Sequence, residues 1–386
     1  MGQTYTGLSG KTKDDFGHGR ARFVTYMNVF SNPISNPEMT EPIEIDPKQN
    51  EVEVGDVFFT TSSETPEEVG MSSILLEKRG KTYLNSFCFG FRPSEKIDSY
   101  YLAYMLRSES ARAKITLLAQ GISRYNISKN KVMEIAVSLP SLDEQKMIGQ
   151  YFSQLDHLIT LHQRKYDKLQ VLKKAMLEKM FPKNGSSVPE IRFKGFTDAW
   201  EQRKLGEIAD IIGGGTPSTS NPSYWDGDID WYAPAEIADQ IYANSSQKKI
   251  TDLGYENSSA KMLPPGTVLF TSRAGIGKTA ILTQKGCTNQ GFQSIVPHRG
   301  ELDSYFVFSR TEELKRYGEL VGAGSTFVEV SGKQMAAMEL MMPSTMREQQ
   351  TIGGFFRHLD NLITLHQREL EKLQNIKKSM LEKMFV

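Results

Sequence analysis

A segment of 38 residues occurs twice in this chain, and this duplication constrains the fold more than any other feature. Residues 144–181 align without a gap to residues 348–385, and 25 of the 38 positions are identical. Both copies contain the phrase LITLHQR, letter for letter. Neither copy contains proline, and the only glycines lie near the start of each, so each copy is suited to one long helix.

Apolar residues recur in each copy at alternating intervals of four and three residues, the pattern of a coiled-coil seam. Pro140 and Pro343, each followed by serine, predict where the two helices begin. At 1.5 Å per residue, each helix would be roughly 57 Å long. Lys173 and Lys377 interrupt the pattern. The predicted seam comprises Ile148, Phe152, Leu155, Ile159, His162 and Leu169 in the first copy and Ile352, Phe356, Leu359, Ile363, His366 and Leu373 in the second.

The seam pattern alone does not fix the role of the helices, because a plain structural stalk or a dimerisation device would show the same pattern. A histidine lies at the same place in each copy, and we interpret it as a packed polar residue that sets the register of the pair.

A weaker repeat lies upstream of each helix. GDVFFTTS from Gly55 resembles GTVLFTSR from Gly266, and DSYYLAYML from Asp98 resembles DSYFVFSR from Asp303. Both regions mix strand-like runs with helical ones, so we expect two diverged α+β globules. The predicted organisation is a first globule at 1–139, a helix at 140–181, a linker and second globule at 182–342, and a second helix at 343–386.

Composition excludes several classes of protein. Lys and Arg total 46, as do Asp and Glu, so the chain does not coat nucleic acid indiscriminately, although local basic patches remain possible. Two cysteines cannot form a disulfide framework, and with no signal peptide or long apolar run we expect a cytoplasmic protein that does not enter a membrane. No catalytic constellation, metal-ligand spacing or cofactor site stands out.

Two motifs suggest chemistry that the rest of the sequence does not support. SRAGIGKT at 272–279 resembles a phosphate-binding loop, but serine stands where the first glycine is required. We interpret it as a basic turn that brings Arg273 and Lys278 to a nucleic acid. NPSY at 221–224 resembles a loop of amino-methyltransferases, but the glycine-rich cofactor turn of a βαβ unit is not found.

Recognition is the chemistry that the sequence favours. Two loop-rich stretches, GLSGKTKDDFGHGRARFV and GGGTPSTSNPSYWDGDIDWY, gather side chains that can bond base edges, although a solvated loop beside an aromatic core is the alternative. The candidate DNA-binding residues are Lys11, Lys13, His18, Arg20, Arg22, Arg79, Lys81, Arg124, Tyr125, Thr216, Ser218, Thr219, Asn221, Tyr224, Arg273 and Lys278.

The two near-identical helices, the string GGTPSTSNPSYWDGDIDW, the run SRAGIGK and the linker PEIRFKGFTDAWEQRKLGEI together resemble the specificity subunit of type I restriction–modification systems. The resemblance covers essentially the whole chain. It implies two target-recognition domains, each addressing one half of a bipartite target in double-stranded DNA. It also implies that the helices pair antiparallel as a spacer, giving pseudo-twofold symmetry.

The resemblance further implies partners and a division of labour. Two methyltransferase subunits would bind the chain, motor–nuclease restriction subunits would join them, and catalysis and cofactors would belong to those partners. A self-contained adenine-N6 DNA methyltransferase or restriction enzyme is the alternative, and a coiled-coil scaffold is a third possibility. The stretch VPEIRFKGFTDAWEQRKLGEI has no counterpart before the first globule, so we expect that globule to lack an edge strand and one methyltransferase contact.

Overall fold

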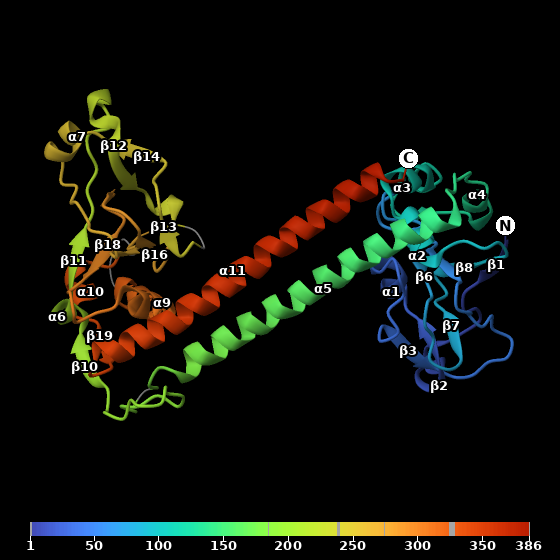
Figure 1. Ribbon diagram of the computed structural model, residues 1–386, viewed down its shortest axis with the longest axis horizontal. Coiled ribbons are helices and arrows are strands. Elements are labelled where there is room, and N and C mark those ends of the chain that lie inside the picture. The colour runs from blue at the N-terminus through green and yellow to red at the C-terminus, as the bar shows by residue number, and fades with distance from the viewer. Residues whose placement is uncertain (1, 184, 238–239, 274, 324–328, 386) are drawn as a thin grey trace. The chain divides into compact units, whose positions relative to one another are not determined.

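The computed structural model describes residues 2–183, 185–237, 240–273, 275–323 and 329–385, which form two compact units (Figure 1). The first unit comprises residues 1–164 and 366–386, and the second comprises residues 165–365. Each unit therefore contains one globule together with part of both long helices. Within the described residues, no helix is long and apolar enough to cross a membrane.

The two copies of the repeat form α5 (Leu142–Lys179) and α11 (Met346–Lys383), each of 38 residues. The helices run antiparallel. In the first unit Phe385, just after α11, stacks on Phe152 near the start of α5, with ring centroids 5.5 Å apart. In the second unit Phe181, just after α5, stacks on Phe356 near the start of α11, with centroids 5.9 Å apart. The α+β fold with a long antiparallel helix pair is confirmed.

The globule of the first unit is built on two main sheets. The antiparallel sheet has the order β1-β8-β4-β6, and the second has the order β3-β2-β7, with β2 and β7 parallel. A short pair, β5 and β9, completes the strands. The elements before α5 are β1 (Gly2–Thr6), η1 (Lys13–Asp15), β2 (Phe16–Val24), α1 (Tyr26–Ser31), β3 (Thr40–Ile43), β4 (Val57–Thr60), β5 (Ser62–Ser63), β6 (Ser72–Ile74), β7 (Thr82–Leu84), β8 (Cys88–Pro93), α2 (Ser99–Met105), α3 (Glu109–Thr116), β9 (Tyr125–Asn126) and α4 (Lys129–Met133).

The globule of the second unit has sheets of the orders β11-β18-β15-β16-β13 and β14-β12-β17, and a two-stranded sheet of β10 and β19. Its elements are β10 (Glu201–Lys204), α6 (Leu205–Ile208), β11 (Ala209–Gly213), η2 (Pro222–Tyr224), β12 (Trp225–Tyr232), η3 (Pro234–Glu236), β13 (Tyr242–Ala243), β14 (Lys248–Ile250), α7 (Asp252–Glu256), β15 (Val268–Phe270), β16 (Thr279–Leu282), β17 (Cys287–Thr288), β18 (Gln293–Pro297), α8 (Ser304–Phe308), α9 (Thr311–Gly322), α10 (Gly332–Ala336) and β19 (Glu339–Met342).

The two globules share one strand order despite their diverged sequences. The order β1-β8-β4-β6 corresponds to β11-β18-β15-β16, and β3-β2-β7 corresponds to β14-β12-β17, including the parallel pair and an irregularity early in β2 and in β12. A close approach recurs as well. A Cβ atom on Gly7 would lie 2.0 Å from the Asn85 carbonyl oxygen, and one on Gly214 would lie 1.9 Å from that of Asn289. The internal repeat thus extends through the globules.

The strand pair β10–β19 of the second globule has no counterpart among the described strands of the first. In the second unit, β10 pairs antiparallel with β19, which directly precedes Pro343. Residues 136–139 directly precede Pro140 and form no strand.

Candidate nucleic-acid interface

The predicted seam residues anchor each globule on the helix pair. Ile148, Phe152 and Leu155 are buried in the core of the first unit, and Ile352, Phe356 and Leu359 in that of the second. Ile363 is buried as well, whereas the remaining predicted seam residues are half-buried, namely Ile159, His162, Leu169, His366 and Leu373.

The two seam histidines face each other. The Nδ1 atoms of His162 and His366 lie 3.0 Å apart, so one ring nitrogen donates and the other accepts, according to tautomer. These are equivalent positions of the repeat, 204 residues apart. The contact is therefore one between the repeat and its own copy.

The two lysines that interrupt the seam pattern cross to an aspartate on the other helix. Lys173 Nζ lies 2.6 Å from Asp360 Oδ1 in the second unit, and Lys377 pairs with Asp156 in the first. A tyrosine of the adjoining globule completes each cluster: Tyr305 donates to Asp360 and Tyr104 to Asp156, both at 2.8 Å. Burial, followed by the neighbouring carboxylate, raises the pKa of both tyrosine hydroxyls.

A second repeated contact attaches each globule to its helix. The side chain of Gln145 accepts a hydrogen bond from the backbone N–H of Asp98, and that of Gln349 accepts one from Asp303, both at 3.0 Å. These aspartates are the N-caps of α2 and α8. The helix repeat therefore preserves the residues that hold the globules, which is a physical reason for its near identity.

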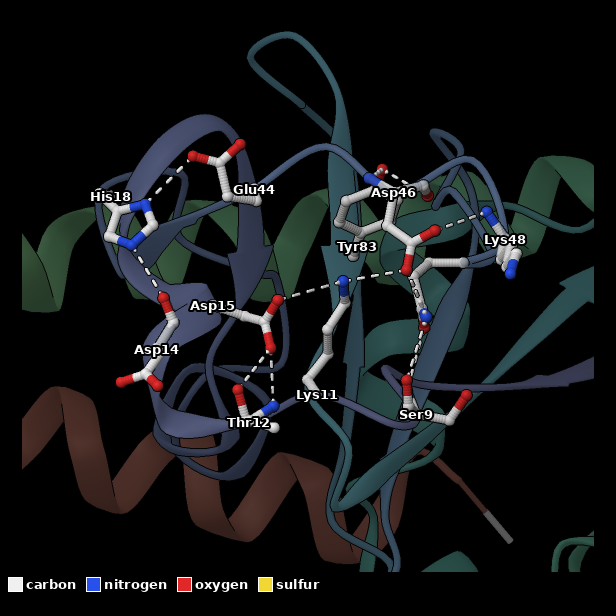
Figure 2. A network of polar contacts seen from close by, with 11 residues as sticks. Ser9, Lys11, Thr12, Asp14, Asp15, His18, Glu44, Asp46, Lys48 and Tyr83 are labelled. Carbon is white, nitrogen blue, oxygen red and sulfur yellow. Dashed lines mark hydrogen bonds and ion pairs between the residues drawn. The ribbon is translucent and has the colours of Figure 1, made fainter.

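Two predicted DNA-binding residues of the first globule belong to a network of polar contacts (Figure 2). Lys11 Nζ lies 2.9 Å from Asp46 Oδ2 and 3.7 Å from Asp15 Oδ1. His18 contacts Glu44 through Nδ1, and the carbonyl of Asp14 through Nε2. The hydrogen bond from Lys11 is the first of several that hold the pKa of the Asp46 carboxyl well below its usual range. Lys11 is thus engaged within the globule.

Strand β2 carries His18, Arg20 and Arg22, so these residues lie on a strand where the sequence had suggested turns. The pairing of β2 with β3 is interrupted between Phe16 and Ala21, which puts His18 and Arg20 in the irregular part of the strand. Arg20 is exposed, as is Lys13 in η1.

Arg22 and Arg79 line one small cavity of the first globule. The Nε atom of Arg22 donates to Thr40 Oγ1 at 2.6 Å, and Arg79 Nη1 lies 2.6 Å from Glu38 Oε1. Lys81 Nζ lies 4.0 Å from Glu51. Most of the cations of this region are therefore balanced by acidic residues that lie far away in the sequence.

Tyr125 is the first residue of β9, in the short pair β5–β9, and Arg124 directly precedes it. The guanidinium of Arg124 lies 5.8 Å from the centroid of the Phe87 ring, and its Nη2 donates to Ser62 Oγ at 3.3 Å. Tyr125 pairs with Ser63. The structure brings Arg124 together with Phe87, a residue that the sequence analysis did not select.

In the second globule, the predicted hydroxyl and amide residues form a compact turn. Asn221 caps η2 and accepts from the Ser223 amide at 3.2 Å. The indole of Trp225 donates to the Ser218 carbonyl at 3.1 Å, and Lys248 lies over the Trp225 ring. Thr219 is exposed and Tyr224 is half-buried. The NPSY motif thus has a structural role as a helix cap.

Two further residues of the second globule were missed by sequence reasoning. Thr216 donates to Gln290 at 2.5 Å, so Gln290 lies beside a predicted contact. Its only sequence signal is its place beside Asn289, the counterpart of Asn85. Lys248, over Trp225, carried no local signal because its partner is 23 residues away in the chain.

The described residues of the glycine-rich run form a tight turn between β15 and β16. Gly275 and Gly277 have positive φ angles of 102° and 96°, and Thr271 binds the turn by donating to the Gly275 carbonyl and accepting from the Lys278 amide. Arg273 Nε lies 2.8 Å from Glu329, whereas Lys278 is exposed. The glycines are therefore explained by the backbone of this turn.

Comparison with known proteins identifies the family of this chain. A sequence model described as "Type I restriction modification DNA specificity domain" matches it twice, at residues 11–171 and 197–375, which together make up most of its length. The chain belongs to this family.

Individual members of the family agree with this assignment. The specificity subunit of the type I restriction enzyme MjaIX from Methanocaldococcus jannaschii is 34% identical over 190 residues, 48% of this chain and 44% of that protein. The MjaVIII specificity subunit of the same organism is 22% identical over 325 residues, 80% of this chain and 74% of that protein. The region that matches this chain therefore makes up less than half of the length of the MjaIX subunit.

A solved structure shows the same fold. The S subunit of a type I restriction–modification system from M. genitalium superposes with a TM-score of 0.62 at 14% identity, covering 100% of this chain and 94% of that one.

Proposed function

We propose that this specificity-family chain recognises a bipartite DNA target, one half with each globule, and catalyses no reaction itself. The observation that carries the proposal is the contrast between the two parts of the repeat. The helices are nearly copied, whereas the globules keep one strand order and differ in their surface loops. Two recognition domains that bind different sequences but are held by the same kind of helix would produce this pattern.

The helix pair is proposed to set the distance between the two half-sites. Each helix has 38 residues, so its length at 1.5 Å per residue is about 57 Å. Base pairs follow one another at about 3.4 Å along duplex DNA. A helix of this length matches about 17 base pairs of duplex, so it suits half-sites more than one helical turn apart.

The repeated helices are also proposed to present equivalent docking surfaces to two methyltransferase subunits, with motor–nuclease subunits joining for cleavage. Tyr151 and Leu161 are exposed on α5, and Leu365 on α11, which supports a surface that a partner covers. Methyl transfer to adenine and DNA cleavage are assigned to those partners.

Domain exchange tests the proposal. Methylated adenines are mapped genome-wide in cells that express this chain with its partner subunits. Replacing residues 1–139 with the first globule of another family member is expected to change one half of the methylated target and leave the other half and the spacer unchanged. A change in both halves, or methylation without sequence preference, would contradict the proposal.

A further inference from the structure

Phe87 is a large aromatic side chain held outward by a rigid turn. The residue is 54% exposed and lies between β7 and β8. Its backbone is fixed on both sides: the amide donates to Asn85 Oδ1 at 2.8 Å, and the carbonyl accepts from the Thr61 amide at 2.9 Å and the Thr61 hydroxyl at 2.8 Å. A single exposed apolar residue is common on protein surfaces, but one on such a constrained backbone is already positioned for contact.

The charged groups around Phe87 favour a polyanion. Arg124 lies against the ring and is exposed, and Lys129 lines a hollow with Ser86, which precedes Phe87 on the same turn. Among the described residues neither Arg124 nor Lys129 forms an ion pair, in contrast to Lys11, which is bound to Asp15 and Asp46. The carboxylate of Glu68 accepts a hydrogen bond from Ser63, the strand partner of Tyr125, at 3.0 Å.

The second globule has no side chain at the corresponding place. Its equivalent turn positions Gly291 by the same bond, from the Gly291 amide to Asn289 Oδ1 at 2.7 Å. The ring of Phe87 is therefore a feature of the first globule alone, added to a turn that both globules share.

We propose that Phe87, backed by Arg124, is a wedge that stacks against or between base pairs of the first half-site. Proteins that deform DNA insert phenylalanine and other apolar side chains between base steps, and cationic residues beside them bind phosphates. Recognition of the first half-site then depends partly on how easily one base step unstacks, which adds specificity without a hydrogen bond to a base edge. This inference rests on the proposed function.

Fluorescence of 2-aminopurine tests the wedge. The assembled complex of this chain with its methyltransferase partners is titrated onto duplexes of its mapped target, with 2-aminopurine placed at each adenine-compatible position of the first half-site in turn. Binding of the wild type is expected to raise the emission at one step severalfold. In Phe87→Ala and Phe87→Gly the rise is lost and affinity falls roughly 5- to 150-fold, the range for losing one stacked base.

Two further variants separate the wedge from indirect effects. Phe87→Trp is expected to restore both the emission and the affinity, because an aromatic face is kept. Leu320→Ala, which removes an exposed side chain of the second globule, is expected to change neither.

Three results overturn the inference: flat emission at every position with the wild type, an unchanged rise in Phe87→Ala, or failure of Phe87→Ala to assemble with the methyltransferase subunits. Sequence-selective binding with flat emission removes the wedge and leaves the proposed function intact. Loss of all sequence selectivity in the wild type contradicts the proposed function itself.

Discussion

At the scale of single residues, the cationic side chains predicted to bind DNA differ in whether they already form ion pairs with carboxylates of the protein. Lys11 and Arg79 are paired with carboxylates, whereas Lys13, Arg20 and Lys278 are exposed and form no ion pair within the described residues. A paired cation must give up its partner before it contacts a phosphate. The unpaired group is therefore the better candidate for direct contact.

The pairing of Lys11 predicts a pH dependence. The pKa of Asp46 is lowered in the folded protein, first by Lys11 and then by the amide of Lys48 and the side chain of Gln49. A lowered folded-state pKa stabilises the protein above the unfolded-state value of about 3.9, and this contribution is lost as pH falls through the folded-state value. In Lys11→Met the Asp46 pKa is expected to rise part of the way to its ordinary value, measured by NMR titration of the carboxyl carbon.

The same variant should lose its stability difference from the wild type in acid. The difference in melting temperature between wild type and Lys11→Met is expected to shrink as pH falls below about 4, because the Asp46 carboxyl of the unfolded chain becomes protonated there. A difference that is constant from pH 7 to pH 2 would show that the ion pair does not stabilise this loop.

The ion pairs of Lys173 and Lys377, which cross between the helices, give a prediction that depends on the burial of their aspartates. The Asp360 side chain is 6% exposed and that of Asp156 is 28% exposed. Asp360→Ala leaves Lys173 and the Tyr305 hydroxyl without their buried partner, so we expect a loss of about 3 kcal/mol in the free energy of unfolding. Asp156→Ala, at a more solvated site, should cost about 1 kcal/mol. Urea denaturation measures both.

A double variant provides the control for this comparison. Lys173→Met together with Asp360→Ala removes the unpaired charge, and part of the loss should be recovered. Equal costs for the two aspartates would mean that the crossing pairs do not differ in their solvent screening.

At the scale of elements, the docking of α8 on α11 depends on one glycine of an adjacent pair. A Cβ atom on Gly353 would lie 2.6 Å from Asp303 Oδ1 and 2.9 Å from the Phe306 amide nitrogen, whereas a Cβ on Gly354 would meet nothing within 4 Å. Gly353→Ala should therefore destabilise the protein by about 2 kcal/mol through this overlap. Gly354→Ala should stabilise it by up to about 1 kcal/mol, because alanine favours the helix.

Thermal unfolding distinguishes the two glycine variants, which differ only in which neighbour receives the methyl group. Gly149→Ala is expected to behave like Gly353→Ala, since its Cβ would lie 2.6 Å from the Tyr101 amide nitrogen. If both variants of the 353–354 pair shift the melting temperature in the same direction, close packing of α8 on α11 is not the reason for a glycine at position 353.

The long helices could be predicted from the sequence because their pattern is local. Proline, the seam spacing and the absence of internal breakers lie within one segment, and α5 and α11 begin within three residues of the predicted prolines. The crossing of Lys173 to Asp360 could not be predicted, because it depends on the antiparallel register of segments far apart in the chain.

The candidate site was less accessible to prediction for the same reason. The carboxylates that lie closest to Lys11 and Arg79, those of Asp46 and Glu38, are 35 and 41 residues away in the sequence, and only the folded sheets bring them together. The parallel pairing of β2 with β7 is equally non-local. Residue type identified potential contacts, but the balance of charge around each one required the structure.

At the scale of the whole molecule, the repeat makes the proposed spacer testable by its length. A heptad inserted into both helices at equivalent positions, between Leu161 and His162 and between Leu365 and His366, keeps the seam in phase. Seven residues add about 10.5 Å of helix, or about three base pairs of duplex. The inserted chain is therefore expected to prefer targets whose half-sites lie about three base pairs further apart.

Selection from a duplex library with both half-sites fixed and the spacer varied measures this preference directly. An insertion in α5 alone is the matched control, because it puts the Lys173–Asp360 and Lys377–Asp156 pairs out of register with each other. That variant should lose stability and select no defined spacer. A chain with both insertions that still selects the original spacer would show that the helices do not set the distance between the half-sites, because the added length would then have no effect on where the two globules bind.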